Sequence, residues 1–202
     1  MSDEIQFIIS GSSNIKHEFI VKAVLNDLTR SQKSSSLVKT DKHFKREETE
    51  RLKISINSMN LWVSDIDLEN YVSEGAEQKV YLKNGKSVIK LNDAIYYISW
   101  IDYLHNLLLH NYFFPDTAYQ LLGFFENNSE LYAVVEQPYV KATEKTDLSA
   151  VKQFMEVNGF KNVRNNDYLN SDLGIIIEDL HDENVLTQNS VLYFIDTVFY
   201  II

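Results

Sequence analysis

The segment from Asp179 to Asp196 constrains the fold more than any other part of the chain. It sets Asp179, Asn184 and Asp196 against short apolar runs, so that a carboxylate is followed by a carboxamide and then by a second carboxylate. Apolar runs that are broken by polar turns are typical of short strands. The segment therefore predicts a strand, a loop and a further strand, with oxygen-bearing side chains in the loop and at a strand end.

These oxygen atoms indicate a particular chemistry. Magnesium takes hard oxygen ligands, keeps much of its water and bridges the phosphates of a nucleotide. ATP-dependent phosphotransferases mount a catalytic acid/base and two magnesium ligands in this order. Two carboxylates about 4 Å from a phosphate oxygen would each repel it by roughly 4 kcal/mol at an effective dielectric of about 20, so ATP would bind here only with a divalent ion. The competing interpretation is that these Asp and Asn residues only form turns.

Composition limits the other functions. With 202 residues, of which 45% are hydrophobic and 24% charged, the chain has material for one domain, or for one domain with a helical extension. The formal net charge of −10 opposes nonspecific binding to nucleic acid. The chain has no Cys, which excludes disulfides and thiolate metal sites. Because no stretch approaches the length of a membrane span and no signal peptide is evident, we expect a cytoplasmic protein without membrane contact.

Hydrophobic periodicity divides the chain into a helical first part and a mixed second part. Helices are predicted from Asn14 to about Arg30 and from about Glu47 to Met59. The later elements are predicted as a hairpin at 80–91, a helix from Asn92 to about Tyr112, strands at 119–126 and 130–137, a helix at 147–158, and strands at 174–177, 184–186 and 191–196. The chain is therefore predicted to be α+β.

Two of these elements carry strong local signals. Asn84-Gly85 lies between the two halves of the hairpin, and this dipeptide favours the tight primed turn. Asp147 is a favourable residue for the start of a helix, and Gly159 is a favourable residue just beyond its end. We expect the hairpin and this helix to form as predicted.

The order of these elements resembles the protein-kinase-like fold. Five segments carry this resemblance: a loop in the place of the glycine-rich loop, a strand lysine, a helix that would support it, a hinge, and the acidic loop with its final strand. They are 73–81, 88–90, 92–112, 134–139 and 179–196.

A narrower resemblance is to a bacterial family, the polyvalent protein kinases, which are often encoded on mobile elements. It rests on the loop around Gly75, the stretch from His110 to Pro115, the pair Gly123-Phe124, and the run from Asp179 to Leu186. The resemblance covers about Leu61 to Ile202. The acidic loop is also similar to that of aminoglycoside and choline phosphotransferases, in which Asp-Leu-His also precedes a metal-binding Asn.

The resemblance implies a role for each matching residue. Asp179 would orient the acceptor hydroxyl and take its proton, and Asn184 and Asp196 would hold magnesium. Lys90 would pair with the α- and β-phosphates of ATP as a point charge. His181 would support the loop.

Further nucleotide contacts are implied in the first half of the resembling region. The backbone around Gly75 would cover the phosphates, and the backbone of Gln137 and Tyr139 would pair with adenine. The predicted supporting helix has no obvious Glu to pair with Lys90, and Asp102 is its best-placed acid.

The resemblance also implies a division of the chain. Residues 1–68 are predicted to form an α-helical N-terminal extension, and 69–202 a truncated kinase-like domain. This domain would have an N-lobe at about 69–138, with an antiparallel sheet and a helix, and a reduced C-lobe at about 139–202. Because the sequence ends six residues after Asp196, we expect a small acceptor, a partner chain that completes the C-lobe, or nucleotide binding without transfer.

The function predicted from the sequence is that of an ATP- and magnesium-binding kinase-like protein. It would transfer the γ-phosphate to an unidentified hydroxyl acceptor, which is a small molecule or a protein. Two alternatives stay open at this point. One is a catalytically weak pseudokinase that acts as an interaction module of a mobile element, and the other is a non-enzymatic structural α+β domain.

Overall fold

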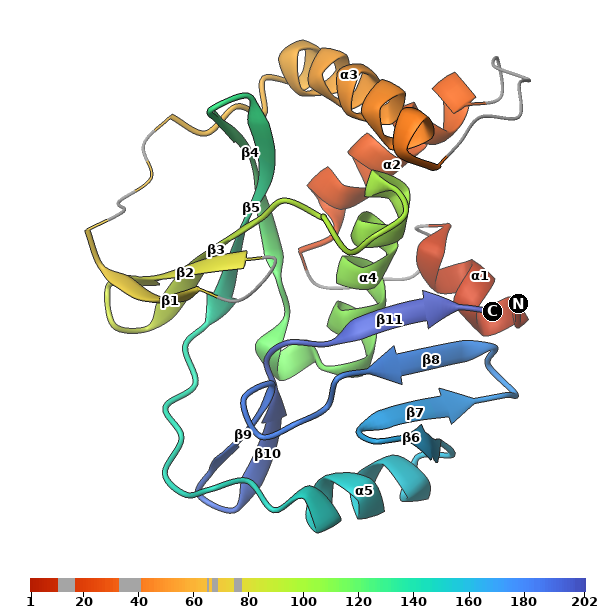
Figure 1. Ribbon diagram of the computed structural model, residues 1–202, viewed down its shortest axis with the longest axis vertical. Coiled ribbons are helices and arrows are strands. Elements are labelled where there is room, and N and C mark those ends of the chain that lie inside the picture. Colours follow the sequence, from red (N-terminus) through yellow and green to blue (C-terminus); the bar gives the residue numbers. More distant parts are fainter. Residues whose placement is uncertain (11–16, 33–40, 65, 67–68, 75–77) are drawn as a thin grey trace. The chain divides into compact units, whose positions relative to one another are not determined.

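The computed structural model describes residues 1–10, 17–32, 41–64, 66, 69–74 and 78–202 (Figure 1). The chain forms two compact units, and each is described by itself. Unit 1 comprises Met1–Lys16, Leu108–Ala118 and Val140–Ile202, and unit 2 comprises His17–Leu107 and Tyr119–Tyr139. Helices and antiparallel strands occur in both units, so the predicted α+β class is confirmed. Within the described residues, no helix is both long and apolar enough to span a membrane.

Unit 2 consists of helices and an antiparallel sheet. Its elements are α2 (Phe19–Gln32), α3 (Asp41–Met59), β1 (Tyr71–Glu74), β2 (Gln78–Lys83), β3 (Ser87–Asn92), β4 (Gln120–Asn127), β5 (Glu130–Pro138) and the first part of α4 (Trp100–Phe113). Within the described residues, the five strands pair in the order β1-β2-β3-β5-β4. The helices α2 and α3 contact each other, and α2 also contacts β4. The predicted extension, residues 1–68, is therefore divided: from His17 onward it belongs to the same unit as this sheet, and Met1–Lys16 belongs to unit 1.

The β2–β3 hairpin forms as predicted. Lys83 pairs with Ser87, and the turn between them has positive φ at both central residues, 48° at Asn84 and 71° at Gly85. A type I′ turn requires positive φ at both central residues, and it is favoured in hairpins because its twist matches that of the flanking strands. The local sequence signal is therefore sufficient to determine this element.

The helix predicted from Asn92 begins only at Trp100, so the first eight positions of that prediction are wrong. The reason is local. Oδ1 of Asn92 accepts from the amide of Ala94 (2.7 Å), and Oδ1 of Asp93 accepts from the amide of Ile95 (2.9 Å). Such side-chain bonds compete with helical hydrogen bonds and hold the backbone in turns.

The start of α4 is fixed by contacts with α3. The buried carboxylate of Glu48 accepts from the amide of Trp100 (2.6 Å), and the Trp100 indole donates to Oγ1 of Thr49 (3.0 Å). Lys45 donates to the carbonyl oxygens of Ala94 and Tyr97. The first turn of a helix has amides without partners in the helix, and here a neighbouring helix supplies an acceptor.

Unit 1 contains short strands and helices. Its elements are α1 (Asp3–Ile9), the end of α4, the 3₁₀ turn η1 (Pro115–Thr117), α5 (Leu148–Val157), β6 (Lys161–Arg164), β7 (Asp167–Asn170), β8 (Ile175–Glu178), β9 (Val185–Gln188), β10 (Val191–Phe194) and β11 (Val198–Ile201). One sheet has the order β11-β8-β7-β6, and β9 pairs with β10 in a separate ribbon.

The helix α5 forms as predicted. Asp147 is its N-cap, with a carboxylate that accepts from the amide of Ser149 (2.9 Å), and Gly159 follows it with a φ of 83°. Its buried residues Val151 and Met155 are one turn apart and face the interior of the unit.

Candidate functional site

The loop that begins at Asp179 follows β8 and is held by the turn between β6 and β7. The amide of Asp179 donates to Oδ1 of Asp167 (3.1 Å), and the amide of Leu180 donates to the carbonyl of Asn166 (3.1 Å). Asp179 has a φ of 65°, a left-handed conformation that Asp adopts more readily than most residues. Leu180 is fully buried, whereas the Asp179 side chain is 61% exposed. The loop thus anchors its backbone and presents the carboxylate to solvent.

Asn184 is bonded directly to Asp179. Its side-chain amide donates to the carbonyl of Asp179 (2.9 Å) and to Oδ2 of the same residue (3.1 Å). Because the nitrogen of the carboxamide makes these two bonds, the oxygen of the carboxamide points away from Asp179. The carboxamide oxygen of Asn184 makes neither of these bonds, and it is the atom of this side chain that can bind a metal.

His181 contacts the other oxygen of the same carboxylate. Its Nδ1 accepts from the amide of Glu183 (3.2 Å), and its Nε2 lies 3.3 Å from Oδ1 of Asp179. Nε2 also lies 3.2 Å from the side-chain nitrogen of Asn184, so His181, Asn184 and the Asp179 carboxylate form one cluster. The two carboxylate oxygens of Asp179 are thus held by different side chains, Oδ1 by His181 and Oδ2 by Asn184.

The segment that carries Asp196 is joined to the same loop. The backbone carbonyl of Asn184 accepts from the amides of Ile195 (2.9 Å) and Asp196 (3.3 Å). Unit 1 therefore brings together Asp179, His181, Asn184 and Asp196, although they span 18 positions of the sequence from Asp179 to Asp196.

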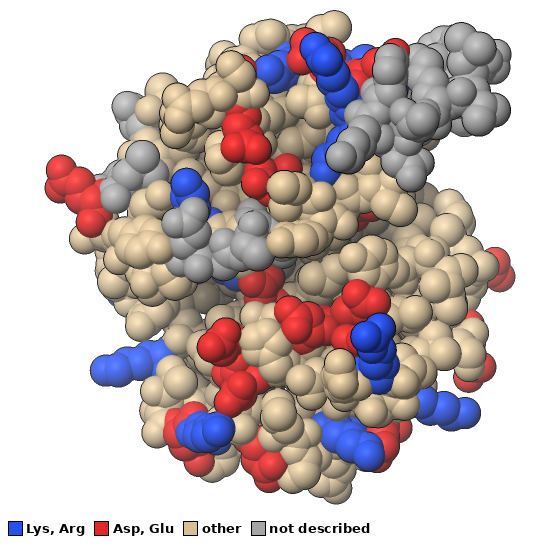
Figure 2. Space-filling model, in the orientation of Figure 1, with Lys and Arg blue, Asp and Glu red and all other residues tan. Residues whose placement is uncertain are grey.

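The surroundings of the loop are acidic. Burial raises the pKa of Glu178, and the charges of Asp167 and Asp179 raise it further, against the opposing effect of Arg164. Figure 2 shows acidic side chains gathered on the visible face of unit 1, in keeping with the net charge of −10. A cation would be attracted to this region, and an uncompensated phosphate would be repelled.

The chemistry of the donor set fits magnesium. Asn184 and Asp196 offer a carboxamide oxygen and a carboxylate, and magnesium is commonly bound through one or two carboxylates together with substrate phosphates and water. No group of three or more His, Asp or Glu side chains suited to a metal occurs among the residues that the structure describes. The two predicted ligands are therefore a partial set, which nucleotide and water would complete.

Lys90 lies in unit 2, in the middle strand of the sheet. It pairs with Val80 on β2 and with Val135 on β5, and its side chain is 3% exposed. Its Nζ is 3.4 Å from the hydroxyl of Tyr119 and 5.2 Å from the centre of that ring. Side chains alternate along a strand, so Lys90 faces away from Leu91, which belongs to the apolar cluster on the opposite face.

The predicted hinge residues lie at the end of β5, also in unit 2. Gln137 is buried and pairs with Val88, and Tyr139 is 41% exposed. The amide of Tyr139 donates to the carbonyl of Lys86 (2.9 Å), so this donor is already used by the hairpin.

Asp102 takes part in a helix cap. Its Oδ2 accepts from the hydroxyl of Ser99 (2.7 Å), while its amide donates to the same hydroxyl (3.0 Å). The Ser99 hydroxyl thus caps the first turn of α4, and the Asp102 carboxylate bonds this hydroxyl and not the Ser99 amide of a full capping box. The predicted pairing of Asp102 with Lys90 stays a prediction, and Gly75 lies outside the described residues.

Sequence reasoning missed the residues that hold the loop from outside it. Asn166 and Asp167 anchor its start, and they belong to the polar run Asn165-Asn166-Asp167. Such a run is a turn signal, and it could have predicted a turn there. It contains no information about which distant loop the turn contacts.

Comparison with known proteins gives one family. A family model described as "Serine/Threonine/Tyrosine Kinase found in polyvalent proteins" matches residues 45–202. The match includes α3 from Lys45 onward, and with it the contacts of Glu48 and Thr49 with α4. No curated protein sequence matches the chain.

Proposed function

Because the chain belongs to the family of serine/threonine/tyrosine kinases found in polyvalent proteins, we propose that it binds ATP with magnesium and transfers the γ-phosphoryl group to a hydroxyl acceptor. The observation that carries this proposal is the bonding of the acidic loop. The side-chain amide of Asn184 donates to Asp179, and the backbone carbonyl of Asn184 accepts from the amide of Asp196. Asn184, itself one proposed magnesium ligand, thus ties the proposed acid/base to the other ligand, Asp196.

Asp179 is the proposed acid/base. Its exposed carboxylate can accept a hydrogen bond from an acceptor hydroxyl, and in a loose transition state the proton is transferred late. Asn184 donates to Oδ2 of this carboxylate and Nε2 of His181 lies 3.3 Å from Oδ1, so the two side chains restrict the orientation of the carboxylate. Orientation of the hydroxyl is therefore the main contribution proposed for Asp179.

Two further groups act on the phosphates. Bound magnesium neutralises phosphate charge, and Asn184 and Asp196 are the residues that would hold it. Lys90 is proposed to pair with the α- and β-phosphates. Its ammonium is buried beside the hydroxyl of Tyr119 in the middle strand of the sheet.

The test compares binding with turnover. We expect Mg-ATP to raise the midpoint of thermal unfolding, since ligand at 100 times its dissociation constant adds about 2.7 kcal/mol of stability. EDTA should remove most of this shift. Asp179→Asn should keep the shift but lose phosphate transfer, whereas Asp172→Asn, with the same charge change at an exposed position of unit 1, should retain both. No shift with Mg-ATP, or full turnover in Asp179→Asn, would refute the proposal.

A pseudokinase is the second candidate, and two contacts favour it. Asp102 is engaged by Ser99, and the amide of Tyr139 is engaged by Lys86, so two groups that a kinase would use for Lys90 and adenine have other partners. The same experiment separates the candidates. A pseudokinase would bind ATP without transferring phosphate in the parent chain, and a purely structural domain would not bind it.

A further inference from the structure

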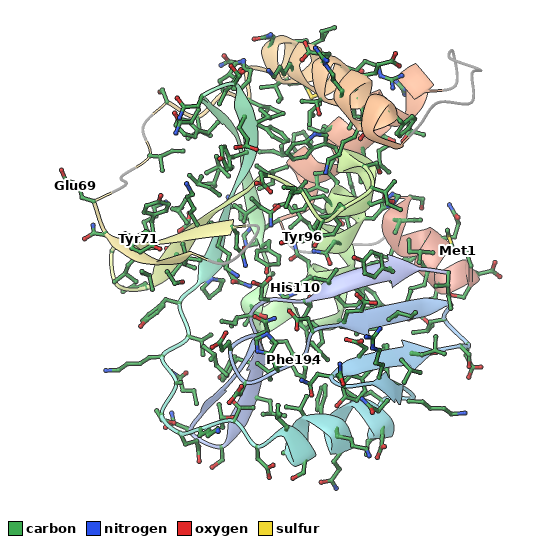
Figure 3. All side chains as sticks on the ribbon, in the orientation of Figure 1. Met1, Glu69, Tyr71, Tyr96, His110 and Phe194 are labelled. Carbon is green, nitrogen blue, oxygen red and sulfur yellow. The ribbon has the colours of Figure 1, made fainter. Side chains whose placement is uncertain are left out.

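A buried histidine in unit 1 lies beside the segment that carries Asp196. His110 is on the last turn of α4 and is 0% exposed. Its Nδ1 is 2.7 Å from the hydroxyl of Thr197, and its Nε2 is 3.0 Å from the carbonyl of Thr117. Figure 3 shows His110 on α4 and Phe194 at the end of β10.

The partners determine the proton positions on this ring. A carbonyl can only accept, so Nε2 carries the proton that is donated to Thr117. In the neutral ring Nδ1 then has a free lone pair, and the hydroxyl of Thr197 donates to it. The Thr117 hydroxyl also lies 3.3 Å from Nε2 but donates to the carbonyl of Phe194, so in this arrangement Thr197 is the donor and Nδ1 of His110 the acceptor.

The segment from Phe194 to Thr197 is also held at Phe194, by Thr117 and Phe114. The hydroxyl of Thr117 donates to the carbonyl of Phe194 (2.5 Å), and the ring of Phe114 stacks on that of Phe194 at 4.2 Å between centroids and 13° between planes. His110 and Thr117 therefore fix the backbone on both sides of Asp196. The carbonyl of Asn184 fixes it in between, through the amides of Ile195 and Asp196.

From this geometry we infer that Thr197 and His110 are positioning residues for Asp196. They set the backbone from which the proposed magnesium ligand extends, and they do so without touching nucleotide or metal. Residues that orient metal ligands are typically worth 10- to 100-fold in metal affinity. The inference rests on the proposed function, because it concerns the same magnesium ligand.

Thr197→Val is the sharpest test, because it keeps the shape of a buried side chain and removes only the donor. We expect the Mg²⁺ concentration that half-saturates ATP binding, measured by calorimetry, to rise roughly tenfold. Affinity for ATP in EDTA should not change. Thr197→Ser, which restores a hydroxyl, should return the Mg²⁺ requirement towards that of the parent chain. Ser55→Ala is the matched control, since it removes a buried hydroxyl that bonds Asp27 in unit 2.

Hydrogen exchange provides a second readout that needs no nucleotide. In the protein without ligands, Thr197→Val should speed exchange of the Ile195 and Asp196 amides, and Ser55→Ala should not. Faster exchange with an unchanged Mg²⁺ requirement would refute the positioning role, and so would unchanged exchange. If the parent chain does not bind Mg-ATP, the proposed function fails. The exchange comparison then decides by itself whether Thr197 holds the segment, and equal rates in Thr197→Val and the parent overturn the inference.

Discussion

Gly123 lies in the edge strand β4, where it allows the segment from Leu61 to Val63 to bond with this strand. Replacing Gly123 with Ala should separate the segment from the strand. Phe124 donates to the carbonyl of Leu61 (2.9 Å), and Val63 donates to the carbonyl of Phe124 (2.8 Å), beside a bulge in β4. Gly123 has a φ of 151°. A Cβ at this position would lie 2.2 Å from the carbonyl oxygen of Leu61 and 2.9 Å from a methyl group of Val63.

The size of the effect follows from which atoms collide. The oxygen of Leu61 belongs to the backbone, so no side-chain rotation relieves the contact and the segment must move. Loss of the two hydrogen bonds costs about 1 kcal/mol each. The unfavourable φ adds about 1–2 kcal/mol for a residue with a side chain. We therefore expect Gly123→Ala to lower the free energy of unfolding by about 3–4 kcal/mol, a large part of the roughly 5–15 kcal/mol of a typical protein.

Urea denaturation measures this loss, and Gly85→Ala is the matched control. Gly85 also has a positive φ, 71°, but nothing lies within 4 Å of the position of its Cβ. Gly85→Ala should therefore lower the free energy of unfolding only through the unfavourable backbone conformation, by about 1–2 kcal/mol. If Gly123→Ala loses no more unfolding free energy than Gly85→Ala, the close approach of the Leu61 carbonyl does not require glycine at position 123, and the reasoning is refuted.

Two further predictions concern pH. Burial raises the pKa of Glu48, so its contribution to stability is complete below the ordinary carboxyl pKa and is lost as pH rises through the raised value. Glu48→Gln, which keeps an acceptor for Trp100, should therefore gain stability relative to the parent as pH rises above the ordinary carboxyl pKa in urea titrations, and a constant difference would contradict this. Hydrogen bonds from Ser149 lower the pKa of Asp147, whose contribution is present above the ordinary carboxyl pKa and is lost as pH falls through the lowered value. Asp147→Ala should lower the thermal midpoint at neutral pH, and the difference should shrink as pH falls below the ordinary carboxyl pKa; a difference that stays constant in acid would count against the cap.

Elements with a local signal could be predicted from the sequence. The hairpin at Asn84-Gly85 needs positive φ at two adjacent residues, and few dipeptides supply it. The helix that follows Asp147 has a cap at one end and Gly159 at the other. In both cases the decisive interactions lie within four residues along the chain, so pattern and structure agree.

The start of α4 shows why other elements could not be predicted. Aromatic and apolar residues continue the helical pattern back to Asn92, but the helix begins at Trp100. Two influences decide this start. The side chains of Asn92 and Asp93 hold turns, and the carboxylate of Glu48 caps the helix from α3. The bond between Glu48 and Trp100 joins residues 52 positions apart, so it cannot be predicted from a local sequence pattern.

Short edge strands were missed for a different reason. The residues of β6 are all exposed, so this strand has no alternation of apolar and polar side chains to recognise. The strand β11 contributes through its pairing with β8, where Phe199 lies opposite Ile177. Its position is determined by a partner strand that comes more than twenty residues earlier in the chain.

For the candidate site, the sequence motif predicts which residues belong to the site, but not which residues hold them in place. Asp179, Asn184 and Asp196 were named from their order in the sequence, and the structure joins them through hydrogen bonds of Asn184. The anchors of this arrangement, Asp167 and His110, lie in other elements. Their residue types are common in turns and helices, so only the folded chain reveals what they hold.

The chemistry of the acidic loop explains why Asp179→Asn is a better probe than Asp179→Ala. Asn184 donates to the backbone carbonyl of Asp179 as well as to Oδ2, and the first bond does not depend on the side chain. A carboxamide at 179 still offers one oxygen to the second bond. Its nitrogen would lie near Nε2 of His181, where the side-chain nitrogen of Asn184 already lies 3.2 Å away. The loop thus keeps its shape while the group that accepts a proton is removed, and a loss of turnover can be assigned to that group.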